Sequence, residues 1–185
     1  MEVIKTEIDG ALIIEPKVFG DSRGYFFESF NEREFEEKTG VVVKFVQDNE
    51  SMSCRGVVRG LHFQKPPYAQ SKLLRCVVGR VLDVAVDIRK GSTTYGKFVA
   101  CELSEENHRQ FFIPKGFAHG FAVLSDVAVF QYKCDEFYHP EAEGAIAWDD
   151  PEIGIPWPVR PEDAVLSAKD REHPCLSDFD SPFSI

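Results

Sequence analysis

Alternation of apolar and polar side chains along residues 79–89 limits the fold more than any other feature of the chain. An extended segment there carries one face of Leu82, Val84, Val86 and Ile88 and an opposite face of Asp83, Ala85 and Asp87. Similar short runs, separated by Gly, Pro, Asn, Asp and Ser, cover residues 24–30, 41–46, 72–78, 97–103, 110–113, 121–124 and 127–134. Many short strands between turn residues predict an all-β sandwich or barrel.

One helix is predicted between the strands. Asn31 is suited to cap its N-terminus, and Glu34 completes a capping box. Lys38 lies in the last turn, and Gly40 can adopt the left-handed conformation that ends a helix. A second, short helical turn is expected from Ser104, because two glutamates follow it.

The 185 residues are enough for one buried core, so we expect a single domain over residues 1–185. From Pro140 onward proline becomes frequent while the alternation fades. This change predicts a C-terminal tail that wraps over the barrel and forms no second domain.

A formal net charge of -10 makes the chain a poor partner for nucleic acid or an anionic membrane. The N-terminus has no basic and apolar leader, and no stretch reaches the roughly 20 apolar residues that span a bilayer. We therefore expect a soluble cytoplasmic protein. The five cysteines are scattered and include no C-x-x-C, which predicts reduced thiols.

A histidine and several cations crowd into the segment Arg59-Gly-Leu-His-Phe-Gln64 and the run that follows it. His62 is the one group there able to act as a neutral base near pH 7, although a lone histidine on a strand is more often a packed residue. Arg59, Lys72 and Arg75 lie on two strands that we expect to be adjacent. Regular alternation would put Arg59 and His62 on opposite faces, so their joint action requires a bulge at Gly60.

Tyr132 shares a predicted inward face with Phe130 and Cys134. A tyrosine in such a place is usually core, but its hydroxyl could also serve as a general acid. Asp170 has no distinguishing local pattern and reads as a loop carboxylate.

The segment Pro114-Lys-Gly-Phe-Ala-His-Gly120 resembles the second motif of the cupin jelly-roll superfamily. Metal-binding cupins supply H-x-H and a glutamate from their first motif, where this chain has His62-Phe-Gln64. Two histidines and an amide would close a zinc, iron or manganese site poorly. We therefore expect no catalytic metal and no other cofactor.

Six segments in order make the resemblance specific: Arg23-Gly-Tyr-Phe-Phe-Glu28, Gln47-Asp-Asn49, Arg59-Gly-Leu-His-Phe-Gln64, Asp83-Val-Ala-Val-Asp87, the cupin-like segment and Ser167-Ala-Lys-Asp170. Together they resemble the dTDP-4-dehydrorhamnose 3,5-epimerase family, over nearly the whole chain. The resemblance implies a cupin-type jelly roll that inverts C3 and C5 of dTDP-4-dehydro-6-deoxy-glucose, a step toward dTDP-L-rhamnose. Both carbons flank the C4 ketone, so a base and a cation suffice for the chemistry.

The resemblance also implies roles for individual residues. His62 is expected to remove the proton, Asp170 to orient its imidazole, Tyr132 to return a proton from the opposite face, and Lys72 to stabilise the enolate oxygen. The implied substrate-binding residues are Arg23, Phe26, Glu28, Gln47, Asn49, Arg59, Lys72, His119, Tyr138, Glu143 and Lys169. The family forms homodimers, in which the N-terminal region of one subunit can complete the site of its partner.

Three other interpretations remain open at this stage. A related epimerase that inverts only one centre would share the fold, the base and the acid. A cupin-like module that binds sugar nucleotides without chemistry would bind without proton exchange, and a metal-dependent cupin enzyme would lose activity to chelators.

Overall fold

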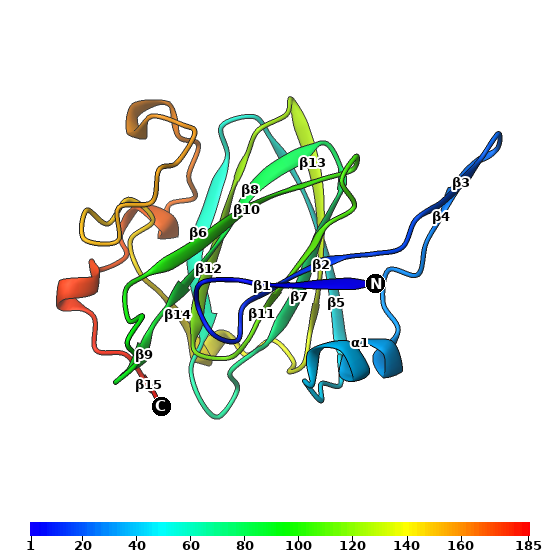
Figure 1. The fold of residues 1–185 in the computed structure, drawn as a ribbon. Helices are drawn as coiled ribbons and strands as arrows, with labels where there is room; N and C mark the ends of the chain where they lie inside the picture. The colour runs from blue at the N-terminus through cyan, green and yellow to red at the C-terminus, as the bar shows by residue number, and fades with distance from the viewer.

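Two antiparallel sheets packed face to face form the body of the computed structural model, which describes residues 1–185. Figure 1 shows the sheets as the layers of a flattened barrel. The first sheet has the strand order β1-β2-β11-β7-β13-β5, and the second has the order β10-β8-β12-β6-β14. The predicted all-β jelly roll is confirmed.

The strands are short, as the spacing of turn residues predicts. Their bounds are β1 Glu2–Lys5, β2 Leu12–Glu15, β3 Phe19–Asp21, β4 Gly24–Phe26, β5 Gln47–Cys54, β6 Val58–Gln64, β7 Lys72–Val78, β8 Arg80–Asp87, β9 Arg89–Lys90, β10 Phe98–Ser104, β11 Gln110–Ile113, β12 Phe117–Val123, β13 Val127–Cys134, β14 Glu143–Ala145 and β15 Phe183–Ser184. One α-helix, α1, spans Glu32–Thr39, and 3-10 turns lie at Pro140–Ala142, Pro161–Asp163, Lys169–Arg171 and Leu176–Asp178.

The main core lies between the two sheets. Phe111 of β11 and Phe130 of β13 are among its largest fully buried side chains, and Val81 and Ala85 of β8 reach it from the other sheet. Burial of each large apolar side chain contributes about 1.5–3 kcal/mol, so this layer dominates the stability of the sandwich.

Helix α1 covers the outer face of the first sheet and forms as predicted. The Asn31 side chain accepts a hydrogen bond from the Glu34 N–H at 3.2 Å, and Gly40 ends the helix with φ 72°. Phe35 is the buried residue of the helix, and its ring meets that of Phe112 at a centroid distance of 5.3 Å. The cap fixes the start of α1, and Phe35 fixes the helix against the sheet.

The C-terminal tail covers the outer face of the second sheet, as the proline-rich sequence predicts (Figure 1). Val84, Val86 and Ile88 of the β8 region pack there against Ile153 and Phe183 of the tail. The alternation along residues 79–89 is thus confirmed, and its apolar face lies under the tail. The face that carries Asp83 points into the sandwich, because Ala85 on that same face belongs to the central core.

Three structural predictions were wrong. Residues 41–46 form no strand, although Val43 is buried with α1, and the strand expected over residues 24–30 ends at Phe26. The single turn expected from Ser104 does form: the His108 N–H donates to the Ser104 carbonyl at 3.1 Å and the Asn107 N–H donates to the Ser104 hydroxyl at 3.0 Å, but no helix continues from it. Strands β6 and β7 are not neighbours, because they belong to opposite sheets.

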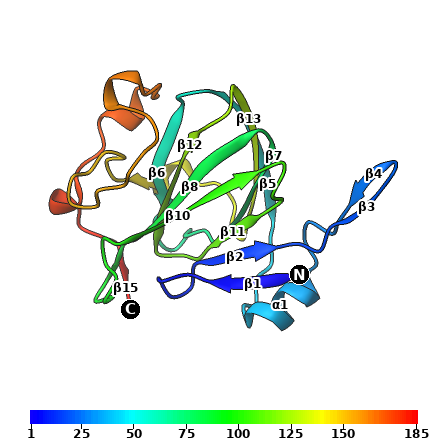
Figure 2. The same cartoon turned by 45° about the horizontal axis from the view of Figure 1, so that its top comes forward.

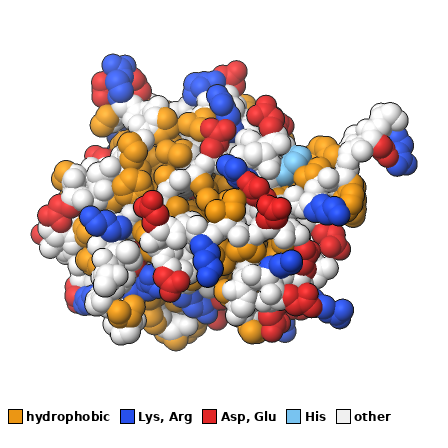
Figure 3. Space-filling view, viewed as in Figure 1, with side chains coloured by type: hydrophobic (Ala, Val, Ile, Leu, Met, Phe, Trp, Pro, Cys, Tyr) orange, Lys and Arg blue, Asp and Glu red, His pale blue; other side chains and the backbone are white.

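A hairpin of β3 and β4 extends away from the body, and we call residues 19–26 the arm. Figures 2 and 3 show it clear of the rest of the molecule. Phe19, Tyr25 and Phe26 on the arm are 54%, 62% and 65% exposed. An apolar hairpin this exposed is typical of a surface that contacts a partner. Separately, no helix of the structure has the length and apolar character to cross a membrane.

Candidate active site

A polar cavity of about 320 Å³ opens between the two sheets. Its walls consist of Gln47, Asn49, His62, Phe63, Gln64, Gln70, Lys72, Tyr132, Tyr138 and Glu143. Both sheets contribute, because β6 and β14 lie on one side and β5, β7 and β13 on the other. Half of the site residues predicted from the sequence therefore meet at this cavity.

His62 and Asp170 form a hydrogen-bonded pair at the edge of this cavity. The His62 Nε2 lies 2.6 Å from the Asp170 Oδ1, and the side chain of Asp170 is only 4% exposed. Ser167 donates to the other carboxylate oxygen at 2.7 Å. Burial alone would raise the pKa of Asp170, but the hydrogen bonds from His62 and Ser167 outweigh it and leave that pKa below its ordinary value. Asp170 is therefore a fixed anion beside the imidazole.

A bulge in β6 aligns Arg59 with His62, as their joint action requires. His62 pairs with His119 of β12 and Arg59 pairs with Phe121, so β6 contains one residue more than its neighbour. Gly60 absorbs the extra residue with φ 138°, and a Cβ at Gly60 would lie 2.5 Å from the Cα of Gly120. Only glycine fits there. Arg59 then donates from Nε to the Ser53 hydroxyl of β5 at 3.1 Å.

Lys72 and Tyr132 approach each other on the wall opposite His62. The Lys72 Nζ lies 5.7 Å from the centroid of the Tyr132 ring. Burial lowers the pKa of Lys72. The negative charges of Cys134, Asp83 and Glu143 act to raise that pKa, but burial outweighs them. Burial also raises the pKa of Tyr132, which keeps its phenol protonated at neutral pH. Arg75 does not join Arg59 and Lys72 as expected. It points out of the sandwich, and its guanidinium lies over the ring of Phe27.

His119 lies deeper in the sandwich than His62. Its Nε2 is 2.6 Å from the Asp83 Oδ1, and its side chain is 10% exposed. Burial lowers the pKa of His119, so the ring is poorly suited to carry a full charge. The structure therefore places His119 behind the cavity wall, and its predicted contact with substrate stays a prediction.

The positions that would hold a cupin metal do not suit one in this chain. The Gln64 amide donates to the carbonyls of Tyr68 and Phe137, and its oxygen accepts from the backbone N–H of His139. With His119 bound to Asp83, the donor atoms are already used within the protein. A metal held by His62, Gln64 and His119 would have to break each of these bonds.

The remaining predicted binding residues fall into two groups. Gln47 accepts from the Tyr138 N–H at 2.9 Å, and Lys169 meets Glu143 at 3.2 Å where the cavity continues into a neighbouring one. Arg23 and Phe26 belong to the arm and do not line the cavity of their own chain. Glu28, just beyond the arm, contacts Asn31 instead.

His173 is a neighbour of the site that the sequence analysis missed. Its Nε2 lies 3.6 Å from the Asp170 Oδ1, on the side away from Ser167. No pattern in the sequence distinguishes it, because it follows Asp170 in an irregular tail. Only the 3-10 turn at Lys169–Arg171 brings the two side chains together.

A jelly roll that encloses a His–Asp pair, a buried lysine and a tyrosine belongs to the class of enzymes that move protons at carbon. Comparison with known proteins narrows that class. Residues 5–178 match the family model described as dTDP-4-dehydrorhamnose 3,5-epimerase, and the chain belongs to this family.

Individual relatives agree with the family match. The dTDP-4-dehydrorhamnose 3,5-epimerase of Shigella flexneri is 61% identical over 92% of this chain and 93% of its own length. The Legionella pneumophila 3,5-epimerase solved with dTDP-4-keto-L-rhamnose is 52% identical, with a TM-score of 0.93 over 97% of this chain and 94% of its own. A 3'-monoepimerase from Streptomyces bikiniensis, solved with dTDP-quinovose, is 33% identical, with a TM-score of 0.87 over 96% and 88%.

Proposed function

We propose that the chain converts dTDP-4-dehydro-6-deoxy-glucose to dTDP-4-dehydro-L-rhamnose by inversion at C3 and C5, without a cofactor. The main support for this proposal is the hydrogen bond between His62 and the buried Asp170, because His62 lines the same cavity as Lys72 and Tyr132. The substrate is inferred from membership of the family, and these four residues provide the acid, the base and the cation that the reaction needs.

His62 acts as the base. A proton on Nε2 donates to the Asp170 carboxylate at 2.6 Å, which leaves the lone pair of Nδ1 for the carbon acid. The carboxylate also stabilises the imidazolium that forms when the proton is taken. Asp170 is thus a positioning residue, and its own orientation is set by Ser167.

Lys72 stabilises the enolate. Removal of either proton beside the C4 ketone shifts charge onto O4, and a cation placed there lowers the barrier. The buried ammonium of Lys72 stands over the Tyr132 ring and faces the cavity, so little solvent screens it. No redox step occurs, because the carbon skeleton keeps its oxidation state.

Tyr132 returns a proton from the face opposite His62. The two residues belong to different sheets, and both line the cavity, so a planar enolate between them would meet the base on one face and the acid on the other. Burial keeps the phenol protonated and ready to donate. This arrangement produces inversion, whereas a single residue serving one face would return the original configuration.

Substrate binding uses the polar residues around the cavity. Arg59 binds the diphosphate, where a guanidinium can make charge-assisted hydrogen bonds. His119 supports the cavity wall from behind through its bond to Asp83. The remaining contacts come from Gln47, Asn49, Tyr138, Glu143 and Lys169, with Tyr138 stacked on the thymine ring. Because these contacts are local, they bind an anionic nucleotide sugar despite the negative charge of the whole chain.

We further propose that the protein is a cytoplasmic homodimer in which the arm completes the site of the partner subunit. The arm exposes Phe26 and the Arg23 guanidinium, which is held in place by Asp21. Neither residue reaches the cavity of its own chain. An arm that reached across a dimer would bring Arg23, Phe26 and Glu28 to the nucleotide of the other subunit.

Deuterium counting tests the function. The purified chain is incubated in heavy water with dTDP-4-dehydro-6-deoxy-glucose and EDTA, and the mass of the nucleotide sugar is measured by mass spectrometry. The proposal predicts two deuterons per molecule. One deuteron would favour the single-centre activity named for the Streptomyces bikiniensis relative, and none, with binding confirmed, would favour a binding module.

A further inference from the structure

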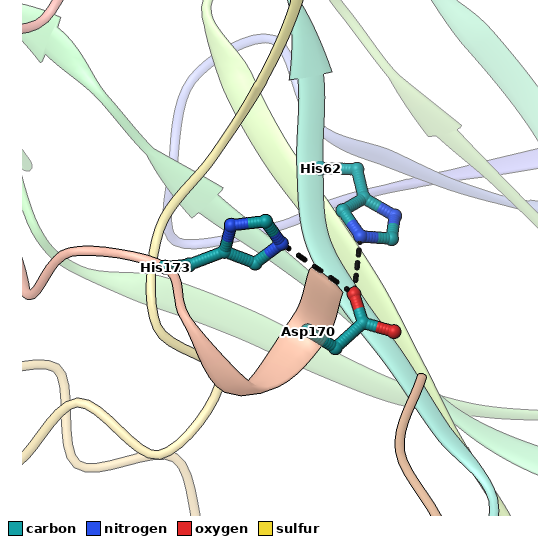
Figure 4. A group of neighbouring side chains, drawn as sticks. All are labelled: His62, Asp170 and His173. Atoms are coloured by element: carbon teal, nitrogen blue, oxygen red, sulfur yellow. Dashed lines mark hydrogen bonds and ion pairs between the residues drawn. The ribbon is translucent and has the colours of Figure 1, made fainter. Parts of the chain in front are cut away.

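Two imidazoles converge on one carboxylate oxygen at the edge of the cavity (Figure 4). The Nε2 atoms of His62 and His173 lie 2.6 Å and 3.6 Å from the Asp170 Oδ1. One ligand atom from each of the three residues falls within 4.8 Å of the others. Proton transfer by His62 and Asp170 does not require His173, so its place here needs another explanation.

The spacing suits a divalent transition metal. Zinc holds imidazole nitrogen and carboxylate oxygen at about 2.0–2.2 Å, which places neighbouring ligand atoms of a tetrahedral site roughly 3.3–3.5 Å apart. The distance from Asp170 to His173 is already close to that value, and the distance from Asp170 to His62 must widen by somewhat less than 1 Å. Two imidazoles and a carboxylate form a ligand set typical of zinc and iron sites.

The polar atom of His173 that faces this cluster has no partner. Its Nε2 is buried and makes no hydrogen bond, although a buried polar group without a partner costs free energy. The ring stands edge-on to that of His62, with centroids 5.8 Å apart and planes at 88°. A metal at the cluster would satisfy this nitrogen.

The rest of the surroundings also suits a bound metal. Ser167 holds the second oxygen of Asp170, as residues behind a metal ligand commonly do. A cavity of about 570 Å³ adjoins the cluster and is lined by both histidines and by Glu143. It offers a route of entry and room for water at a fourth position.

We propose that His62, Asp170 and His173 bind Zn²⁺ or a similar divalent transition metal, and that this metal inhibits the enzyme. Binding through Nε2 replaces the proton that His62 shares with Asp170. The neutral imidazole then carries its one proton on Nδ1 instead of Nε2 and has no lone pair left for the substrate. Inhibition rests on the proposed role of His62, whereas metal binding does not.

The test compares wild type with His173→Phe, which keeps an aromatic ring but removes the ligand. His139→Gln is the matched control, because His139 also contacts a carboxylate, that of Glu141 at 3.0 Å, but lies outside the cluster. Calorimetry with ZnCl₂ and no substrate measures binding, and deuterium exchange into substrate measures inhibition. Both are repeated with MgCl₂, a hard cation that this ligand set disfavours.

We expect wild type and His139→Gln to bind one Zn²⁺ and to be inhibited by it, with recovery on addition of EDTA. In His173→Phe the affinity and the inhibition should both weaken by about tenfold or more, with turnover unchanged when metal is absent. Equal affinity in wild type and His173→Phe would overturn the proposal. Zinc binding that depends on His173 but does not inhibit would support the metal site and contradict the proposed effect of the metal on His62. Mg²⁺ binding as strong as Zn²⁺ binding would contradict the preference of the site for a transition metal.

Discussion

The carboxylate of Asp170 meets the imidazole of His62 at 2.6 Å, although 108 positions separate the two residues along the chain. The β6 strand carries the histidine, and a 3-10 turn of the wrapping tail carries the aspartate. The tail therefore does more than cover the outer face of a sheet, because it also completes the base.

Asp170→Asn should keep the shape of the pair and remove its charge. An amide can also present its N–H to the ring and stabilise the wrong tautomer of His62, so we expect kcat to fall by about 10²-fold or more, within the range of general base catalysis. Affinity for dTDP should change little, because Asp170 faces the imidazole. A variant with normal kcat would show that His62 does not need this partner.

Tyr132→Phe should separate proton removal from inversion. His62 can still take a proton and return a deuteron to the same face, so the substrate should gain deuterium in heavy water without epimerised product. His62→Ala should abolish exchange altogether, while both variants bind dTDP nearly as wild type does. Product formation by Tyr132→Phe at the wild-type rate would remove Tyr132 from the role of acid.

Lys72→Met should remove the cation that faces the enolate while keeping a long side chain in the same space. Loss of one well-placed electrostatic contact costs about 2.7–4 kcal/mol, which corresponds to a decrease in kcat of about 10²- to 10³-fold. Steady-state kinetics should show the loss mainly in kcat. A variant altered only in KM would place Lys72 in ground-state binding.

Mixing two inactive variants tests whether the arm acts across a dimer. Arg23→Ala lacks the contact made by the arm, and His62→Ala lacks the base. If the arm serves the partner, one site of each mixed dimer has both residues, and a random mixture should recover about a quarter of wild-type activity. No recovery after subunit exchange, with exchange confirmed by mass spectrometry, would mean that the arm acts within its own chain or not at all.

Acid should weaken the contribution of Asp87 to stability. Burial acts to raise the pKa of this carboxyl, but hydrogen bonds from Arg89, Ser92 and Thr94 outweigh it and lower the pKa from 3.8 to about 2. A carboxyl with a lower pKa in the folded state than in the unfolded state stabilises the fold. That stabilisation is complete at a pH above the unfolded pKa and is lost as the pH falls toward 2.

Urea unfolding of wild type and Asp87→Asn between pH 7 and pH 2.5 measures this contribution. The difference in unfolding free energy between the two proteins should be constant above about pH 5 and shrink steadily below pH 4. A difference that stays the same down to pH 2.5 would mean that the charge of Asp87 contributes no stability.

The sequence predicted the elements whose patterns reflect burial. Strands β7, β11 and β13 and the capped helix α1 fall where alternation and capping residues indicate. Strand β5 escaped notice because its sequence, Gln-Asp-Asn-Glu-Ser-Met-Ser-Cys, has no apolar face. Its inward side chains line the polar cavity and are polar themselves. The strand therefore lacks the alternation of apolar and polar residues by which strands are usually predicted.

The site was predictable mainly through family resemblance. The cluster of cations around a histidine suggested His62, and periodicity suggested Tyr132. The bulge at Gly60 followed from the need to align Arg59 with His62, and the register confirms it. The pairing of Asp170 with His62 and the nearness of His173 depend on how the tail folds back, which no local pattern encodes. The single domain over residues 1–185 and the roles of the individual residues stay predictions.

Proton NMR in heavy water tests the central claim most directly. Wild-type protein is incubated with dTDP-4-dehydro-6-deoxy-glucose and EDTA while the signals of the protons at C3 and C5 are followed. Both signals should disappear as the L-rhamno product forms, and His62→Ala should prevent both losses. Persistence of either signal while the wild-type protein binds the substrate would contradict epimerisation at both centres.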